Sequence, residues 1–222
     1  MGQHIEFKRR DGGLCGAYHA DAGESRAAII LLQEWWGLNE QIMAQADRYA
    51  LAGFHVLVPD LYHGRVAGDA DEARHLMDHL DFVGATDQDI AAALDFLRAR
   101  SDRVGITGFC MGGALTVAAA VRLQFDAAVC FYGLPAPEWI DPAALAIPFQ
   151  GHFAERDTWI TPAWVDSFVA TMQAAGRQPE IYRYAADHAF CNERRSEVYD
   201  ADLASLALAR TQEFFRRHLF AS

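Results

Sequence analysis

Residues 103–113 read Arg-Val-Gly-Ile-Thr-Gly-Phe-Cys-Met-Gly-Gly, and an apolar stretch with helical character follows over residues 114–121. This pattern is typical of a nucleophile elbow, a tight turn from a strand to a helix that holds a reactive side chain in a strained conformation. Gly108 and Gly112, two positions before and after Cys110, relieve the clashes of such a turn. The positive end of the helix favours a thiolate. The stretch therefore predicts a strand, a sharp turn and a helix, with Cys110 as the nucleophile.

Strands and helices alternate on both sides of this turn. An Asp11-Gly12 step suits a hairpin between residues 3–8 and 13–19. Further strands are predicted at 27–32, 55–60, 126–132, 147–153 and 180–184, and helices at 39–51, 69–80, 85–100, 162–175 and 197–219. Alternation of this kind indicates an α/β fold with a mostly parallel central sheet, helices on both faces and an antiparallel N-terminal hairpin. We expect residues 1–222 to form a single domain.

Composition narrows the possible partners and compartments. The 222-residue chain has a net charge of −11, whereas nucleic acids and anionic membranes require a clustered basic face. No apolar segment has the length of a signal or transmembrane segment. The four cysteines form no Cys-x-x-Cys pair, and a chain of this size needs no disulfides. We therefore expect a cytoplasmic protein, monomeric by default, that binds neither nucleic acid nor membrane.

Two further candidate catalytic residues follow later strands. Asp157 comes after the strand at 147–153, and His188 comes after the strand at 180–184. The order nucleophile, acid, histidine is that of the α/β-hydrolase fold, in which each residue lies on a loop after a strand. Glu155 lies two positions from Asp157 and is an alternative acid, in which case Asp157 would cap a turn.

Several motifs together resemble the dienelactone hydrolase family over nearly the whole chain. They are Gln33-Glu34-Trp35-Trp36-Gly37, Val58-Pro59-Asp60-Leu61-Tyr62, Gly108-Phe109-Cys110-Met111-Gly112-Gly113, Asp157 and His188-Ala189-Phe190. The resemblance implies that Cys110 attacks a lactone or enol ester, that His188 and Asp157 complete a triad, and that Glu34 helps to control the thiol. It also implies a role in the degradation of aromatic compounds and no cofactor.

The chemistry of acyl transfer agrees with these roles. A thiol has a reference pKa of about 8.5, so Cys110 needs a base, and His188 oriented by Asp157 would supply it. The developing oxyanion needs preorganised donors, here the backbone N–H groups of Trp35 and Met111. Apolar surroundings would raise the pKa of Glu34, which could then exchange a proton with the thiol. A purely structural hydrogen bond of Glu34 is the alternative.

Substrate-binding residues are harder to assign. Known dienelactone hydrolases hold a substrate carboxylate with arginines, and the resemblance suggests Arg74 and Arg194 for this role. An ordinary exposed helix arginine is the alternative for Arg74. Trp36 is a candidate for a wall of the pocket, with a place in the core as the alternative. The position four after His188 is Asn192 rather than arginine. The histidines show no recurring metal-ligand spacing, so no metal is expected, and Cys15, Cys130 and Cys191 are interpreted as small buried hydrophobes.

Three classes of function are compatible with the sequence. The leading hypothesis is a cysteine-dependent hydrolase of small lactones or activated esters that works through a thioester, with a broad small carboxylesterase as its closest variant. A ligand-binding protein that has lost turnover is the second class. The third is a thiol redox sensor based on Cys110, in which Cys191, three residues after His188, could approach Cys110 in space.

Overall fold

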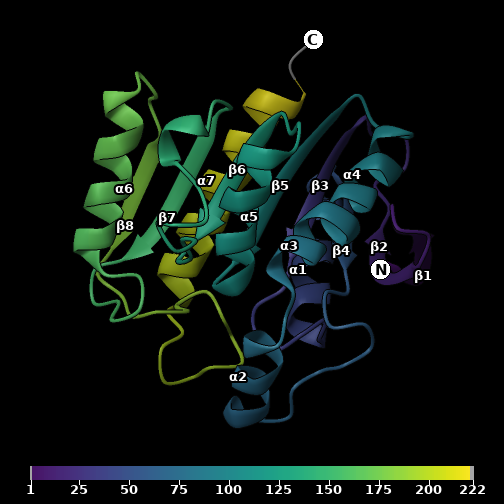
Figure 1. Cartoon of the computed structure of the whole chain (residues 1–222), viewed down its shortest axis with the longest axis horizontal. Coiled ribbons are helices and arrows are strands. Elements are labelled where there is room, and N and C mark those ends of the chain that lie inside the picture. Colours follow the sequence, from purple (N-terminus) through teal and green to yellow (C-terminus); the bar gives the residue numbers. More distant parts are fainter. Residues whose placement is uncertain (1, 221–222) are drawn as a thin grey trace.

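The strand Ala27–Leu32 (β3) shows how the sequence builds the centre of the fold. All six of its residues are buried, and alternate side chains enter two different hydrophobic clusters, Ile30 on one face and Ile29 on the other. A strand covered on both faces needs a continuous apolar run, which is the pattern of a parallel sheet between helical layers. In the computed structural model, which describes residues 2–220, β3 lies near the middle of an eight-stranded sheet (Figure 1).

The sheet is antiparallel at one edge and parallel elsewhere. Its strand order is β1-β2-β4-β3-β5-β6-β7-β8, where β1 and β2 form a hairpin and β2 also runs antiparallel to β4. The remaining strand pairs are parallel. Apart from β3, the strands are β1 (Gln3–Lys8), β2 (Leu14–Ala20), β4 (His55–Pro59), β5 (Arg103–Phe109), β6 (Ala127–Phe131), β7 (Phe149–Ala154) and β8 (Glu180–Tyr184). The predicted fold class and hairpin are confirmed.

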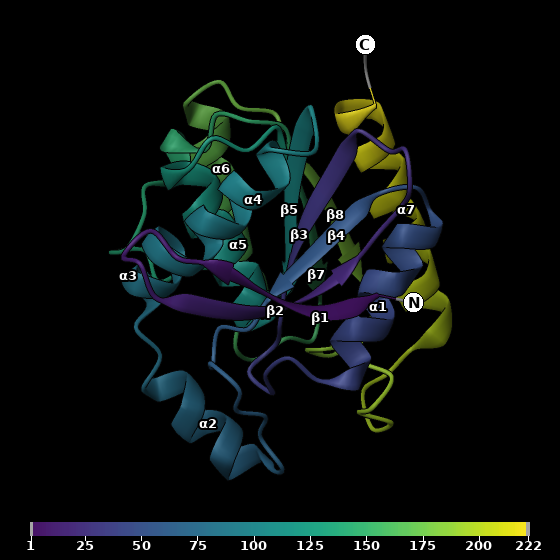
Figure 2. The same ribbon diagram turned by 90° about the vertical axis from the view of Figure 1, so that its right-hand side faces the viewer.

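Helices cover both faces of the sheet (Figure 2). On one face α1 (Glu40–Leu51) and α7 (Ala201–Leu219) pack through residues such as Ile42 and Phe215. On the other face lie α4 (Ala91–Arg98), α5 (Met111–Arg122) and α6 (Pro162–Ala174). Within residues 2–220, no helix combines the length and the apolarity needed to cross a membrane.

Two helix boundaries differ from the prediction. The helix expected at 85–100 begins earlier, at Phe82, because the side chain of Asp81 accepts a hydrogen bond from Gly84 N–H. It runs through α3 (Phe82–Gly84) and a π-helical segment, η1 (Ala85–Ile90), into α4. The terminal helix begins at Ala201 rather than at residue 197, because Asp200 caps it by accepting a hydrogen bond from Leu203 N–H.

The remaining short elements lie in the connections. They are α2 (Ala70–Asp78), which follows β4, and η2 (Pro142–Ala144), which follows β6. In Figure 1, α2 and the loop between β8 and α7 lie at the same end of the molecule. The carboxyl ends of parallel strands meet at one edge of a sheet, so the segments after β5, β7 and β8 can assemble a site there.

Candidate active site

Cys110 occupies a strained turn between β5 and α5. Its backbone has φ 54° and ψ −115°, a conformation that a non-glycine residue adopts only when its surroundings impose it. The glycines of the motif are required for packing: a Cβ on Gly108 would lie 2.3 Å from the carbonyl oxygen of Gly112, and a Cβ on Gly112 would lie 2.5 Å from that of Gln33. The predicted elbow is therefore present.

The structure brings the two other predicted catalytic side chains to Cys110. The Nε2 atom of His188 lies 3.2 Å from Sγ of Cys110, and Nδ1 of His188 lies 2.7 Å from Oδ2 of Asp157. Asp157 is buried, and its second oxygen accepts hydrogen bonds from the N–H groups of Trp159 and Ile160 at 2.8 and 3.0 Å. These bonds fix the carboxylate, so it can hold the imidazole in one orientation.

The alternative acid is not part of this arrangement. Glu155 is exposed, and its backbone N–H donates to the carbonyl of Tyr184. Two residues further along, the chain has turned so that Asp157 faces the histidine loop. Of the two acidic residues, the structure thus pairs Asp157 with His188.

The environment of His188 favours its charged form. Burial alone would lower the pKa of this imidazole, but the hydrogen bonds to Asp157 and Cys110 outweigh burial and raise the pKa of His188 to about 10. The rings of Trp159 and Tyr132 pack against the imidazole at 5.0 and 5.2 Å between centroids. An imidazolium is therefore held between a carboxylate and a sulfur atom, within an aromatic enclosure.

Both carboxylate oxygens of Glu34 accept hydrogen bonds from neighbouring side chains. The hydroxyl of Tyr132 donates to Oε1 at 3.1 Å, and the amide of Asn192 donates to Oε2 at 2.5 Å. Burial raises the pKa of Glu34, and the hydrogen bond from Asn192 opposes that rise. Cys110 is not among the hydrogen-bond partners of Glu34 in residues 2–220, so the interaction of Glu34 with the thiol stays a prediction.

The two predicted oxyanion donors lie on segments that touch. Gly112 packs against the carbonyl groups of Leu32 and Gln33, which brings the loop carrying Trp35 against the start of α5. Met111 is the first residue of α5, where backbone N–H groups have no partner within the helix. Both N–H groups therefore belong to segments that adjoin Cys110.

Known proteins resemble this chain in sequence over nearly its whole length. The sequence profile of the dienelactone hydrolase family matches residues 15–219. The chain belongs to the dienelactone hydrolase family. It is 33% identical to Protein usf of Aquifex pyrophilus, over 99% of this chain and 100% of the relative. It is 26% identical to Carboxymethylenebutenolidase 1 of Cupriavidus pinatubonensis, over 94% of each chain.

Solved structures support the fold. A dienelactone hydrolase-like promiscuous phosphotriesterase from metagenomic libraries superposes with a TM-score of 0.88 over 98% of both chains, at 19% identity. At this identity the likeness concerns the fold alone. The family membership makes this protein a hydrolase that acts on carboxylic esters or lactones.

A cavity opens directly beside Cys110. It encloses about 190 Å³ and is lined mostly by apolar side chains. The lining residues are Met77, Phe82, Cys110, Met111, Ala114, Tyr132, Gly133, Leu134, Pro135, Ala136, Trp139, Trp159, Ile160 and His188. Apart from His188, none of these residues carries a charge.

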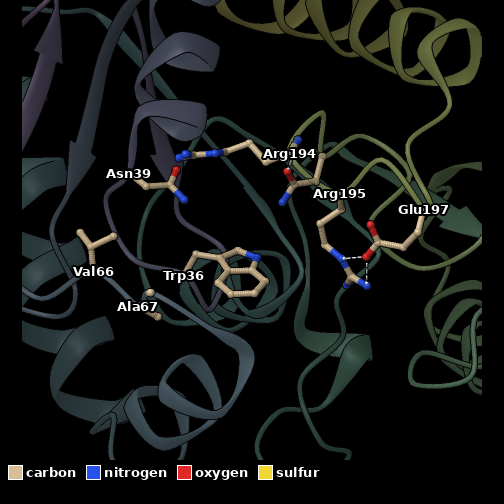
Figure 3. A pocket seen from close by; sticks show the side chains of 9 residues that line it. Trp36, Asn39, Val66, Ala67, Arg194, Arg195 and Glu197 are labelled. Atoms are coloured by element: carbon tan, nitrogen blue, oxygen red, sulfur yellow. Dashed lines mark hydrogen bonds and ion pairs between the residues drawn. The ribbon is translucent and has the colours of Figure 1, made fainter.

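The predicted substrate-binding residues lie elsewhere. Trp36 and Arg194 line a separate pocket of about 500 Å³, in which the side chain of Arg194 extends toward Asn39 while Arg195 pairs with Glu197 (Figure 3). Neither Cys110 nor His188 lines this pocket. Arg74 is exposed on α2 and lines neither of the two pockets. The structure therefore does not bring an arginine into the cavity at Cys110.

A second cluster of polar side chains lies away from Cys110. Atoms of Cys15, His63 and Asp89 that could bind a metal lie within 4.8 Å of one another, although they are far apart in the sequence. Arg9 Nε lies 3.2 Å from Asp89 Oδ1, so a cation already faces this carboxylate. Cys191, the candidate redox partner, is buried, and burial raises the pKa of its thiol well above the ordinary value.

Three residues at the site were not singled out from the sequence. Tyr132 has φ 36° at the end of β6, and a Cβ on the following Gly133 would lie 2.0 Å from the carbonyl oxygen of Cys110. Trp159 covers His188 from the loop that carries Asp157. The Tyr-Gly step after a buried strand was the available signal for the first two. Nothing local indicated that the exposed Trp159 would face the histidine.

Proposed function

We propose that the protein hydrolyses neutral, activated carboxylic esters or lactones by a Cys110-His188-Asp157 triad through a thioester. The observation that carries this proposal is the continuous contact from Sγ to imidazole to buried carboxylate, at 3.2 and 2.7 Å. A base that contacts the nucleophile and is itself oriented by a third group is the arrangement that activates cysteine and serine nucleophiles.

The reaction has two steps. The Cys110 sulfur attacks the carbonyl carbon, a C–S bond forms, and the N–H groups of Trp35 and Met111 stabilise the oxyanion. When the C–O bond to the leaving group breaks, His188 donates its proton to the departing oxygen. In the second step His188 takes a proton from water, the hydroxide attacks the thioester, and the C–S bond breaks to release the acid and the thiolate. Asp157 stabilises the imidazolium whenever it forms.

The sulfur nucleophile limits the range of leaving groups. A thiolate leaves more readily than an alkoxide, so the tetrahedral intermediate of an unactivated alkyl ester tends to expel sulfur again. Enol esters, lactones of enols and aryl esters provide better leaving groups. We therefore assign the protein to activated esters and lactones rather than to amides or simple alkyl esters.

The charge of the cavity favours a broad esterase over a strict dienelactone hydrolase. A relative from Cupriavidus pinatubonensis is named Carboxymethylenebutenolidase 1, a name that denotes a lactone with a carboxymethylene group. Among residues 2–220, no arginine or lysine lines the cavity at Cys110, and the position four after His188 is Asn192. A substrate carboxylate would lose its hydration there without gaining a cationic partner.

Steady-state hydrolysis of a carboxylated dienelactone and of p-nitrophenyl acetate tests this proposal. We expect turnover of the neutral ester that is abolished in Cys110→Ala and weaker turnover of the anionic lactone. Equal turnover of the ester by Cys110→Ala would refute the triad. If only the dienelactone is hydrolysed, the assignment to neutral esters is wrong, and Arg194→Ala would then test whether the neighbouring pocket supplies the cation.

A further inference from the structure

A second cavity adjoins the cavity at Cys110. It has a volume of about 400 Å³ and shares the lining residues Phe82, Ala114 and Trp139 with the first. The rings of Phe82 and Trp139 lie 4.9 Å apart between centroids, where the two cavities meet. The second cavity is an apolar groove formed by Leu80, Asp81, Phe82, Val83, Thr86, Ala114, Leu115, Ala118, Arg122, Trp139 and Ile140.

The groove follows one face of α5. Ala114, Ala118 and Arg122 are spaced by four residues, so their side chains lie along one side of α5, which begins directly after Cys110. Small side chains at positions 114 and 118 leave room between the helix and the opposite wall of Phe82 and Trp139. At 1.5 Å per residue, the path from Cys110 to Ala118 is about 12 Å long.

Polar groups in the groove already have partners within the protein. Asp81 accepts a hydrogen bond from Gly84 N–H, and the Thr86 hydroxyl donates to the carbonyl of Phe82. At the far end, the guanidinium of Arg122 forms two hydrogen bonds with the carboxylate of Asp87. A charged or strongly polar ligand would find few free partners here. An apolar chain would require none.

The rim of the groove exposes large apolar side chains. Val83 is 63% exposed and Trp139 is 50% exposed, although both adjoin a cavity that leads to the nucleophile. Burying such surface under a ligand is favourable, and each methylene fully removed from water contributes about a fourfold change in an equilibrium constant.

We propose that this groove binds the distal part of a medium-length apolar acyl chain whose carbonyl carbon is attacked by Cys110. This inference rests on the proposed function and specifies its substrate class as neutral esters or lactones with an acyl part of about eight to twelve carbons. A chain bond advances about 1.2 Å along an extended chain, so a decanoyl group spans the distance from Cys110 to Ala118. The ion pair of Arg122 marks the polar end of the groove.

A series of p-nitrophenyl esters from acetate to decanoate, used below their micelle-forming concentrations, tests the proposal. The leaving group is constant, so changes in kcat/KM report on the acyl chain. We expect kcat/KM to rise by at least about thirtyfold from acetate to decanoate. Ala118→Phe fills the groove and should reduce the ratio of decanoate to acetate kcat/KM at least about tenfold.

A matched control uses the same substitution outside the site. Ala170 is exposed on α6 and lines neither cavity, so Ala170→Phe should keep the ratio of the parent protein. If circular dichroism shows that Ala118→Phe is unfolded, Ala118→Leu serves instead. Leucine is smaller than phenylalanine, so this variant should lower the ratio of decanoate to acetate kcat/KM by a smaller factor. A flat chain-length profile in the parent protein, or equal ratios in the variants at positions 118 and 170, would overturn the proposal.

Failure of this inference and failure of the proposed function give different results. If acetate is hydrolysed through Cys110 without a chain-length preference, the function stands and the groove has another role. If no ester is hydrolysed, calorimetric titration with 1-decanol still tests the groove, because binding should occur and be lost in Ala118→Phe. Self-association that depends on Ala118, without an effect of chain length, would assign the groove to a second copy of the chain and overturn the proposal.

Discussion

Two histidines, one within β7 and one in the loop that follows the neighbouring strand β8, have opposite acid–base behaviour. His152 lies within β7, and burial lowers its pKa to about 3, with the charge of Arg210 adding to this effect. His188 follows β8; burial also lowers its pKa, but the hydrogen bonds to Asp157 and Cys110 raise it to about 10. The nitrogens of His152 contact only neutral groups, among them the Tyr184 hydroxyl at 2.7 Å.

The difference teaches that burial alone does not make a histidine reactive. Both rings are enclosed by aromatic side chains, Phe131 against His152 and Tyr132 against His188. A buried imidazole with neutral partners stays neutral and serves as a structural hydrogen-bonding group. An imidazole between a carboxylate and a sulfur atom is charged at neutral pH and can donate its proton to a leaving group.

The largest expected effect separates the two histidines by catalysis. His188→Ala should lower kcat/KM for p-nitrophenyl acetate by about 10⁴-fold, because the nucleophile loses its base. His152→Gln should change kcat/KM by less than about threefold, since His152 contacts no reacting group and glutamine retains hydrogen bonding. Parallel kinetics of the two purified variants, with circular dichroism to verify folding, make the comparison. Similar losses in both variants would contradict the distinction.

The next effect concerns the carboxylate that distinguishes the two sites. Asp157→Asn should lower kcat/KM by about 10³-fold, because an amide neither stabilises the imidazolium nor enforces the required tautomer. The same substitution should lower the pKa of His188, which NMR titration of the ring protons can follow. Glu155→Gln is the matched control and should leave both quantities unchanged. If the pKa of His188 in Asp157→Asn stays as high as in the parent protein, a group other than Asp157 raises it.

A smaller effect concerns His152 and the pH dependence of the free energy of unfolding. His152 takes up a proton with an ordinary pKa of 6.5 when unfolded and of about 3 when folded, so the unfolded state binds more protons between these values. The free energy of unfolding should therefore fall as the pH drops below 6.5. Between pH 7 and pH 5 the contribution of His152 is about 2 kcal/mol. Urea unfolding at both pH values should show that the free energy of unfolding decreases less in His152→Gln than in the parent protein. Identical decreases in the two proteins would contradict the assignment of this pH dependence to His152.

The smallest effect concerns Glu34. Replacing it with glutamine removes a charged acceptor for the Asn192 amide and should slow acylation by about tenfold. Stopped-flow release of p-nitrophenol measures the acylation step separately from turnover. Glu40→Gln, at the exposed start of α1, serves as the control. Unchanged acylation in Glu34→Gln would leave Glu34 with a structural hydrogen-bonding role alone.

The sequence predicted best where the chemistry is local. The elbow at Cys110 could be identified because its glycines, strand and helix are contiguous, and His188 because it follows a recognisable strand. The choice of Asp157 over Glu155 depended on how one loop turns, which spacing of two residues does not determine. The start of α7 at Ala201 rather than at residue 197 likewise depends on the Asp200 cap.

The walls of the substrate site could not be predicted from the sequence. Phe82 and Trp139 come from segments far apart in the chain, and their contact arises from tertiary packing. Arg194 follows His188 closely in sequence, yet it lines a different pocket from Cys110. Short-range patterns indicate which residues end a strand, whereas the shape and charge of a cavity depend on side chains from several loops.

Mass spectrometry of the acid-quenched reaction with p-nitrophenyl butanoate tests most directly whether Cys110 carries the acyl group. The account predicts that the protein gains the mass of one butanoyl group within the burst, that peptide mapping assigns it to Cys110, and that Cys110→Ala gains none. An acyl group on another residue, or full turnover by Cys110→Ala, would contradict the central claim.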